Sequence, residues 1–169
     1  QAGIILGKKD VIARIKKNPL TRALRLDKLT LAALESTLRL YRDPKEAVAA
    51  IPTLRMLTMP VGHLEVRAAQ LAEQLIALEN PRLSVEQIPL ESRAGGGSLP
   101  QLKLPTHGIG VTIQNMSANA IEGYLRGYSP PIIGRIEDDM FLMDLRTLGD
   151  DELPTIVSAF SSILERVEP

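Results

Sequence analysis

The chain has 169 residues, 44% hydrophobic and 24% charged, which is typical of a soluble globular protein with one domain or a small domain plus part of another. Net charge is zero, and cysteine is absent, which excludes disulfides, thiol catalysis and thiolate metal sites. The sequence contains no run of about 18 apolar residues, so no transmembrane helix is expected. Two histidines, His63 and His107, lie too far apart for zinc-ligand spacing, so no metal site is expected.

The charge is unevenly distributed along the chain. Residues 1–60 carry twelve Lys/Arg and five Asp/Glu, whereas residues 61–169 carry eight and fifteen. This asymmetry predicts two structural units with different neighbours. The basic part could face an anionic ligand, nucleic acid or solvent. The five aromatic residues are not interleaved with basic ones, so base stacking gives little support for nucleic-acid binding.

The first part of the chain predicts a strand followed by helices. The apolar run "GIILG" (3–7) is typical of a buried strand, and "KKDVIARIKKN" (8–18) of a short helix that ends at Asn18-Pro19. Leucines at helical spacing predict a longer helix from Asp27 to Tyr41, with Asp27 as its N-cap. Residues 44–51 favour another helical segment, and the prolines of 52–60 interrupt the pattern that follows.

The second part predicts an α+β layer. An apolar stripe gives the strongest helix prediction, over 62–79, and the pattern then changes to strands and shorter helices. The further predicted elements are a strand (83–92), a flexible loop (93–100), a strand (108–114), a helix capped by Ser117 (117–128), a hairpin turning at Asp138-Asp139 (132–146) and a closing helix capped by Asp150 or Asp151 (150–167). Helices are therefore expected to cover a small, mostly antiparallel sheet.

Arg22 and Arg25 stand out in the stretch "NPLTRALRLDK". Residues three apart share a helix face, so both guanidinium groups are expected to point in one direction. Such a pair suits a phosphate or similar oxyanion, which guanidinium forks bind through two hydrogen bonds. The alternative is a solvated helix face, with Asp27 or Glu35 as partner.

A second candidate is the glycine-rich loop "RAGGGSLP" with Arg93 and Ser98. Successive backbone N–H groups in Gly95–Gly97 could cradle an anion beside Arg93, or the loop could be a mobile connection between strands. It matches neither the phosphate-loop pattern nor GxGxxG. No Ser/His/Asp set, paired carboxylates or metal cluster is recognisable in the sequence.

Several blocks resemble the bacterial L-seryl-tRNA(Sec) selenium transferases, or selenocysteine synthases. The longest reads "QAGIILGKKDVIARIKKNPLTRALRLDKLTLAALESTLRLY", and "PTLRMLT", "GGGSLP", "PPIIGRI" and "MDLRTL" follow in the family's order. The resemblance covers essentially the whole chain.

The resemblance implies the fold of the aspartate-aminotransferase type (fold type I) of proteins that use pyridoxal 5′-phosphate (PLP). The PLP lysine would lie upstream of Gln1, so a carboxy-terminal fragment, inactive alone, is expected. Neither Lys8 nor Lys9 would replace it, because both follow the strand. Residues 1–23 would end the PLP-binding large domain, 24–59 would be an interdomain helical linker, and 60–169 would form the α+β small domain.

The resemblance also implies a cytoplasmic enzyme, not bound to a membrane, that works as a ring of homodimers. It replaces the serine hydroxyl of seryl-tRNA(Sec) with selenium from selenophosphate, and PLP serves as electron sink. Arg22 and Arg25 match the family's selenophosphate-binding arginines. Gln1, Ala2 and Gly3 would lie near the PLP phosphate, whereas Arg93 and Ser98 receive no assigned role.

Two other interpretations remain open from the sequence. The chain could be part of a related PLP lyase that acts on amino-sugar acids, which would keep the "QAG" strand but need not keep the "TRALR" pair. It could also be a binding or assembly module without catalysis. If residues 3–7 form a strand without its sheet, exposed apolar edges are expected to cause dimerisation or disorder there.

Overall fold

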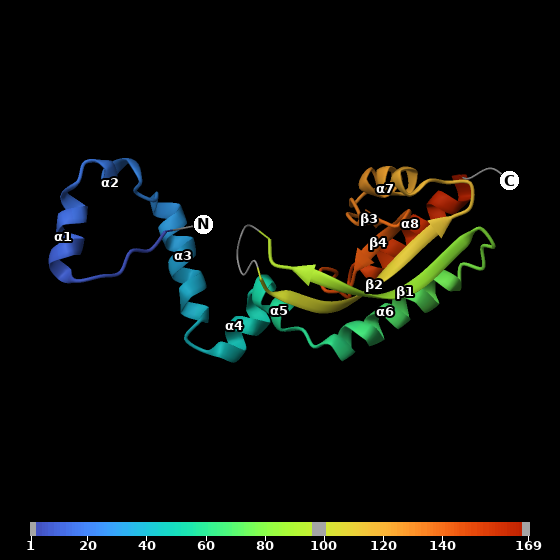
Figure 1. The fold of residues 1–169 in the computed structure, drawn as a ribbon, viewed down its shortest axis with the longest axis horizontal. Coiled ribbons are helices and arrows are strands. Elements are labelled where there is room, and N and C mark those ends of the chain that lie inside the picture. The colour runs from blue at the N-terminus through green and yellow to red at the C-terminus, as the bar shows by residue number, and fades with distance from the viewer. Residues whose placement is uncertain (1–2, 96–100, 167–169) are drawn as a thin grey trace. The chain divides into compact units, whose positions relative to one another are not determined.

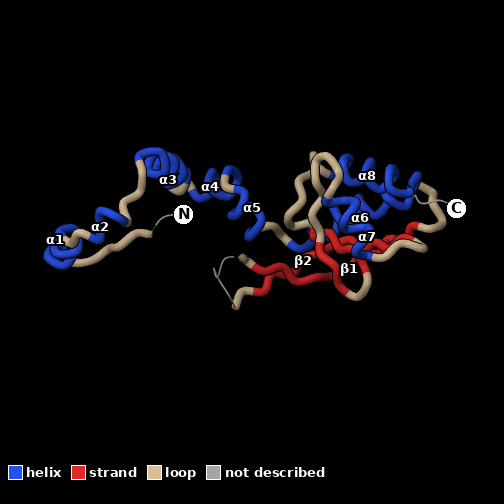
Figure 2. Tube along the Cα trace, turned by 90° about the horizontal axis from the view of Figure 1, so that it is seen from above, coloured by secondary structure: helices blue, strands red, loops and turns tan. Residues whose placement is uncertain are grey.

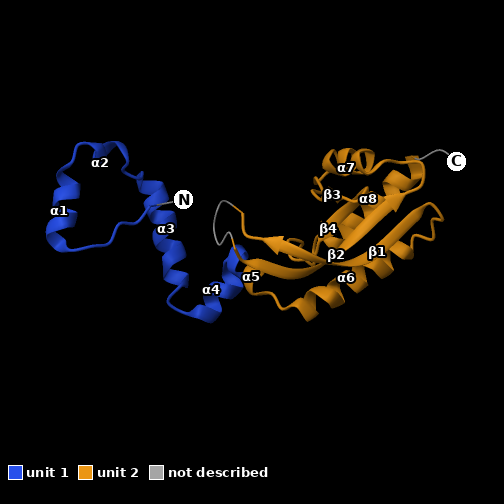
Figure 3. Cartoon of the chain, viewed as in Figure 1, with its two compact units in different colours: residues 1–55 blue, residues 56–169 orange. Residues whose placement is uncertain are grey.

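A computed structural model describes residues 3–95 and 101–166. The chain divides into two compact units, Gln1–Arg55 and Met56–Pro169 (Figure 3). Each unit has its own secondary structure and is described by itself. No helix among the described residues is long and apolar enough to cross a membrane.

The first unit is helical, as the sequence predicts. Its helices are α1 (Lys9–Lys17), α2 (Leu20–Ala23), α3 (Lys28–Leu40) and α4 (Pro44–Ala50), and α5 (Pro52–Thr58) begins in it. Asp27 caps α3, which confirms the prediction, because its carboxylate accepts bonds from the N–H groups of Leu29 and Thr30. Asp43 caps α4 in the same way. Ala47 is the one buried residue among those described in this unit.

The predicted strand over residues 3–7 is wrong. These residues have no regular secondary structure, and Ile4, Ile5 and Leu6 are 64%, 68% and 90% exposed. A strand is stable only when neighbouring strands pair with its backbone and a hydrophobic face is covered. The described part of this unit contains no strand that could pair with this run, so its apolar side chains lie in solvent.

The second unit is the predicted α+β layer. Its described strands are β1 (Leu83–Arg93), β2 (Lys103–Ile113), β3 (Arg135–Glu137) and β4 (Met140–Asp144), and they form an antiparallel sheet in the order β1-β2-β4-β3. Its helices are α6 (Val61–Ile76), α7 (Ala118–Arg126) and α8 (Leu153–Arg166). Figures 1 and 2 show α6 and α8 packed against the same side of the sheet.

The hydrophobic core lies between the helices and one face of the sheet. Strand β2 contributes Ile109, Val111 and Ile113 to it at alternate positions, as expected for a strand with one covered face. The apolar faces of α6, α7 and α8 complete this core. Helices therefore cover one face of a mostly antiparallel sheet, which confirms the α+β prediction.

On the other face of β2, two glycines lie beneath neighbouring side chains. A Cβ on Gly108 would stand 2.3 Å from Cδ1 of Leu90 and 2.7 Å from the carbonyl oxygen of Met143. A Cβ on Gly110 would stand 2.6 Å from Cδ1 of Ile88. Side chains of β1 therefore lie over the glycine positions of β2.

The hairpin between β3 and β4 is confirmed. Asp138 and Asp139 have φ angles of 50° and 58°, so both turn residues adopt the left-handed conformation. This pair of angles matches the right-handed twist of the flanking strands, and aspartate tolerates it better than most residues.

The predicted cap of the closing helix is wrong. Helix α8 begins at Leu153, so neither Asp150 nor Asp151 is the residue that directly precedes it. Asp150 instead accepts a hydrogen bond from Nε of Arg67 at 2.7 Å. Pro154 lies in the first turn, as predicted, where its missing N–H removes no helical hydrogen bond.

Candidate functional site

Arg22 and Arg25 lie close in sequence but do not share one helix. Helix α2 ends at Ala23, so Arg22 lies within it and Arg25 lies in the irregular segment between α2 and α3. The prediction of one helix face is therefore wrong. The cause is Asp27: as N-cap of α3 it has φ −70° and ψ 168°, which is incompatible with a helix running through from α2.

Side-chain hydrogen bonds hold the short helix α2 against the end of α1. The Thr21 hydroxyl donates to the carbonyl oxygen of Ile15 at 3.0 Å and also to that of Asn18. The Asn18 side chain accepts from the N–H of Leu20 at 3.0 Å. An isolated four-residue helix is unstable in water, so these bonds position Arg22 relative to α1.

Both arginines are exposed and form no ion pair with the described residues. Neither partner considered from the sequence is available to them. The pKa of Asp27 is lowered by hydrogen bonds from the Thr30 hydroxyl and backbone N–H, so this carboxylate serves α3. Glu35 pairs with Arg39 at 2.7 Å. Two positive charges thus remain uncompensated within this unit, a condition that favours an anionic ligand.

The structure does not gather the remaining candidates around these arginines. Gln1, Ala2 and Ser98 lie outside the described residues, as do Gly96 and Gly97. Gly3 has open space around it. Arg93 is exposed at the end of β1, in the second unit, where its backbone pairs with Lys103.

The described residues do not by themselves form a site for PLP. Lys8 and Lys9 are exposed at the start of α1, and neither forms an ion pair with the described residues. No group of three or more His, Cys, Asp or Glu side chains within residues 3–95 and 101–166 could hold a metal ion.

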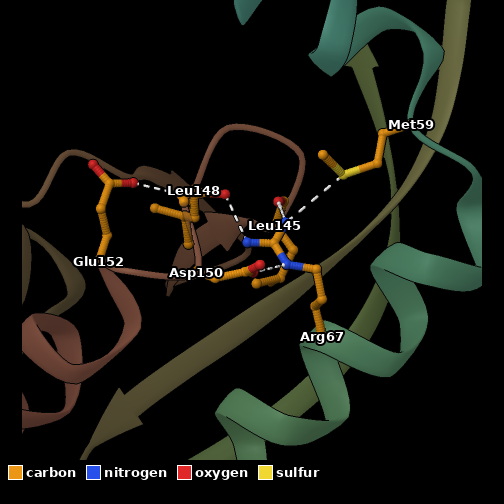
Figure 4. Close-up of polar contacts among 7 residues, drawn as sticks. Met59, Arg67, Leu145, Leu148, Asp150 and Glu152 are labelled. Carbon is orange, nitrogen blue, oxygen red and sulfur yellow. Dashed lines mark hydrogen bonds and ion pairs between the residues drawn. The ribbon is translucent and has the colours of Figure 1, made fainter. Parts of the chain in front are cut away.

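Two buried arginines were missed by the sequence predictions. Arg67, on α6, is 4% exposed, and its guanidinium bonds to the carbonyl oxygens of Leu145 and Leu148 at 2.8 and 2.7 Å and to Asp150 (Figure 4). Its side chain is therefore a structural link between α6 and the segment after β4. The available signal was its position: Arg67 falls on the apolar stripe between Leu64 and Leu71.

The second buried arginine is Arg146, in the "MDLRTL" block. Nη1 bonds to the carbonyl oxygens of Met56 and Met59 at 2.6 and 3.2 Å, and Nη2 bonds to that of Pro105 at 2.6 Å. Its Nε is buried and has no partner among the described residues. The side chain thus ties the residues before α6 to the start of β2, and we assign it a structural role.

Next to Arg146, a half-buried carboxylate organises the sheet end. Asp144 accepts hydrogen bonds from the hydroxyl groups of Ser92 and Thr106 and from the N–H of Arg146. These bonds join β1, β2 and β4. Because its acceptors are occupied by internal donors, Asp144 is a structural residue.

Of the two histidines, His63 is exposed in the first turn of α6. His107 is half-buried on β2, and its Nδ1 has no hydrogen-bond partner among the described residues.

Comparison with known proteins identifies the class of protein. The sequence matches the family described as L-seryl-tRNA selenium transferase over residues 1–149. Proteins named L-seryl-tRNA(Sec) selenium transferase from Hyphomonas neptunium and Geobacter sulfurreducens are 46% and 45% identical to it, over 98% and 96% of this chain. A third, from Geotalea uraniireducens, is 47% identical over 96%.

Because the family match extends over most of its length, the chain belongs to the L-seryl-tRNA selenium transferase family. It spans 35% of the length of each of these three relatives.

Proposed function

We propose that this chain is the carboxy-terminal part of a PLP-dependent enzyme that converts seryl-tRNA(Sec) to selenocysteyl-tRNA(Sec) with selenophosphate. The family match and the names of the similar proteins support this proposal. In the longer protein, PLP supplies the electron sink for exchange at the serine side chain.

Arg22 and Arg25 bind the selenium donor in this proposal. The observation that carries it is that two exposed guanidinium groups, three residues apart, have no carboxylate partner in the described structure. Selenophosphate carries several anionic oxygens, and charge-assisted bonds to arginine are the strong class of hydrogen bond. Because Arg25 lies outside α2, the two side chains can approach the anion from different directions.

The proposal includes the division of the parent protein. Residues 1–23 complete the large domain, 24–59 link the domains, and 60–169 form the small domain of a cytoplasmic homo-oligomer. The missing large domain explains why apolar residues of the first unit, such as Ile4 and Leu6, are exposed in this chain alone.

Steady-state kinetics of the full-length parent enzyme test the role of the arginine pair. Each charge-assisted contact is worth about 1.5–3 kcal/mol, so Arg22→Gln or Arg25→Gln should weaken selenophosphate use by about tenfold or more. Arg42→Gln is the matched control, because Arg42 is also exposed and has no ion pair among the described residues. Unchanged kcat and KM for selenophosphate in both variants would remove the proposed role.

The isolated 169-residue chain should bind no PLP covalently. Incubation with PLP, reduction with borohydride and intact-mass measurement test this expectation. A stoichiometric adduct on one lysine would show that this chain contains a cofactor lysine after all.

A further inference from the structure

Helix α1 has a strongly basic face. At 100° per residue, Lys9, Arg14, Lys16 and Lys17 fall on one side of the helix, and the apolar residues Val11, Ile12 and Ile15 fall on the other. Lys8 adds a further charge at the N-cap. We call Lys8, Lys9, Arg14, Lys16 and Lys17 the basic face of α1. All five are exposed.

The charge of this face is not balanced within the described residues. None of the five cations forms an ion pair there, and the one carboxylate on α1, Asp10, falls on the same side of the helix and offsets only one of the five charges. The other carboxylates of the first unit are mostly committed: Asp27 and Asp43 cap helices, and Glu35 pairs with Arg39. A concentrated positive surface of this kind attracts a polyanion.

The basic face is joined to the proposed donor site. The Thr21 hydroxyl, which donates to the carbonyl oxygen of Ile15, holds α2 and Arg22 against the carboxyl end of α1, where Lys16 and Lys17 lie. If Arg22 holds the selenium donor, the seryl group must come to the same place. That group is esterified to the end of an RNA, so phosphates of that RNA must pass nearby.

We propose that the basic face of α1 binds the sugar-phosphate backbone of the aminoacylated RNA and guides its seryl end toward Arg22. This inference rests on the proposed function, because it takes the position of the donor from it. The contacts are with phosphates, which fix position and orientation rather than sequence. The scarcity of aromatic residues fits this mode, because backbone binding needs no base stacking.

A membrane surface is the other polyanion that an amphipathic basic helix can bind. Interfacial helices bury a broad apolar face rich in Trp, Phe or Leu. The apolar side of α1 has three β-branched residues, and two of them, Ile12 and Ile15, are already half-buried within the chain. The small, partly covered apolar side and the family match both favour RNA.

Cations in the last turn of α1 also interact favourably with the helix dipole, so loss of charge there affects helix stability as well. The test therefore needs a measurement that helix stability alone does not change. The salt dependence of RNA affinity is such a measurement, because its slope reports the number of phosphates neutralised.

The experiment uses the full-length parent protein, fluorescently labelled seryl-acceptor tRNA, and anisotropy titrations over a range of salt concentrations. Lys16→Gln/Lys17→Gln should reduce the slope of log Kd against log salt by about two and weaken binding at low salt. Lys16→Arg/Lys17→Arg should preserve both. The matched control is Arg42→Gln/Lys45→Gln, which removes the same charge from exposed positions elsewhere in the first unit.

An unchanged slope in Lys16→Gln/Lys17→Gln, or an equal decrease in the control, would overturn the proposal. So would binding of the parent to anionic phosphatidylserine vesicles that this variant abolishes while RNA affinity stays the same. In turnover, the variant should raise KM for seryl-tRNA and leave KM for selenophosphate unchanged. RNA binding is measured without selenium transfer. The proposed role of the arginine pair and the proposed role of the basic face can therefore be refuted separately.

Discussion

Arg67 and Asp150, 83 positions apart in sequence, are joined by a 2.7 Å hydrogen bond from Nε to Oδ1. The two side chains differ greatly in environment, because that of Arg67 is 5% exposed and that of Asp150 is 79% exposed. An exposed carboxylate contributes little to such a pair. The important partners of Arg67 are the carbonyl oxygens of Leu145 and Leu148 (Figure 4). Without the guanidinium group, these two acceptors would lie beneath α6 without this hydrogen-bond donor.

This arrangement predicts that Arg67→Met destabilises the second unit. Methionine keeps much of the volume but leaves two carbonyl oxygens unpaired, at about 1–3 kcal/mol each. Native-state amide exchange in α6 and β2 should show the free energy of opening reduced by about 2–6 kcal/mol. Asp150→Asn is the control: it keeps the acceptor oxygen, and its effect should stay below about 1 kcal/mol. Equal effects of both variants would contradict this assignment.

Gly108 should not tolerate alanine. Its Cβ would meet the Met143 carbonyl oxygen at 2.7 Å, and backbone cannot move aside as a side chain can. Gly108→Ala should therefore cost about 1–3 kcal/mol of unfolding free energy. Gly123, within α7, has open space at the same position, so Gly123→Ala should stabilise by about 0.5–1 kcal/mol. Urea unfolding monitored by circular dichroism should show a lower unfolding free energy for Gly108→Ala and a higher one for Gly123→Ala.

Thr21 is predicted to position Arg22. Thr21→Val removes the hydroxyl that donates to Ile15 while keeping the shape of the side chain. Loss of one hydrogen bond is worth about 1 kcal/mol, so KM for selenophosphate in the parent enzyme should rise by up to about fivefold. Thr21→Ser should restore it. Identical kinetics for the valine and serine variants would show that this bond does not support the site.

The cap of α3 should depend on pH. Hydrogen bonds from the Thr30 hydroxyl and backbone N–H lower the pKa of Asp27 below its usual value of 3.8. A lowered pKa in the folded state means that the stabilisation is complete above the unfolded pKa and is lost as pH falls through the folded one. Amide exchange at Leu29 and Thr30 should quicken in acid relative to other helical amides. Asp27→Asn should remove this dependence, since an amide does not titrate.

The elements with regular periodicity were predictable, and the failures have physical reasons. The leucine pattern of α3, the stripe of α6 and the Asp138-Asp139 hairpin depend on local sequence, and all were predicted. The strand at 3–7 was not, because an apolar run cannot reveal whether partner strands exist. Likewise, the sequence cannot show whether Asp150 or Asp151 caps α8 or pairs with a cation, because Arg67, the partner of Asp150, is distant in sequence.

The candidate site, like the fold, was predictable only in part. The sequence identified Arg22 and Arg25 as a candidate oxyanion-binding pair, with Asp27 or Glu35 as the alternative partner, and in the described structure both guanidinium groups are exposed and form no ion pair. The end of α2 at Ala23 was not predicted. An N-cap residue has a non-helical backbone, so Asp27 as the cap of α3 already implies that the preceding helix ends before it. The burial of Arg67 was not predicted, because arginine is usually exposed and the carbonyl groups that it binds lie far away in the sequence.

The bonds of Arg146 also decide where the chain can be cut. Secondary structure alone suggests trimming just before Val61, where α6 begins. That cut would take away the carbonyl groups of Met56 and Met59 and leave an interior cation bound to Pro105 alone through its two terminal nitrogens. A shortened protein that starts at or before residue 56 should therefore give a higher soluble yield and a higher melting temperature than one that starts at residue 61.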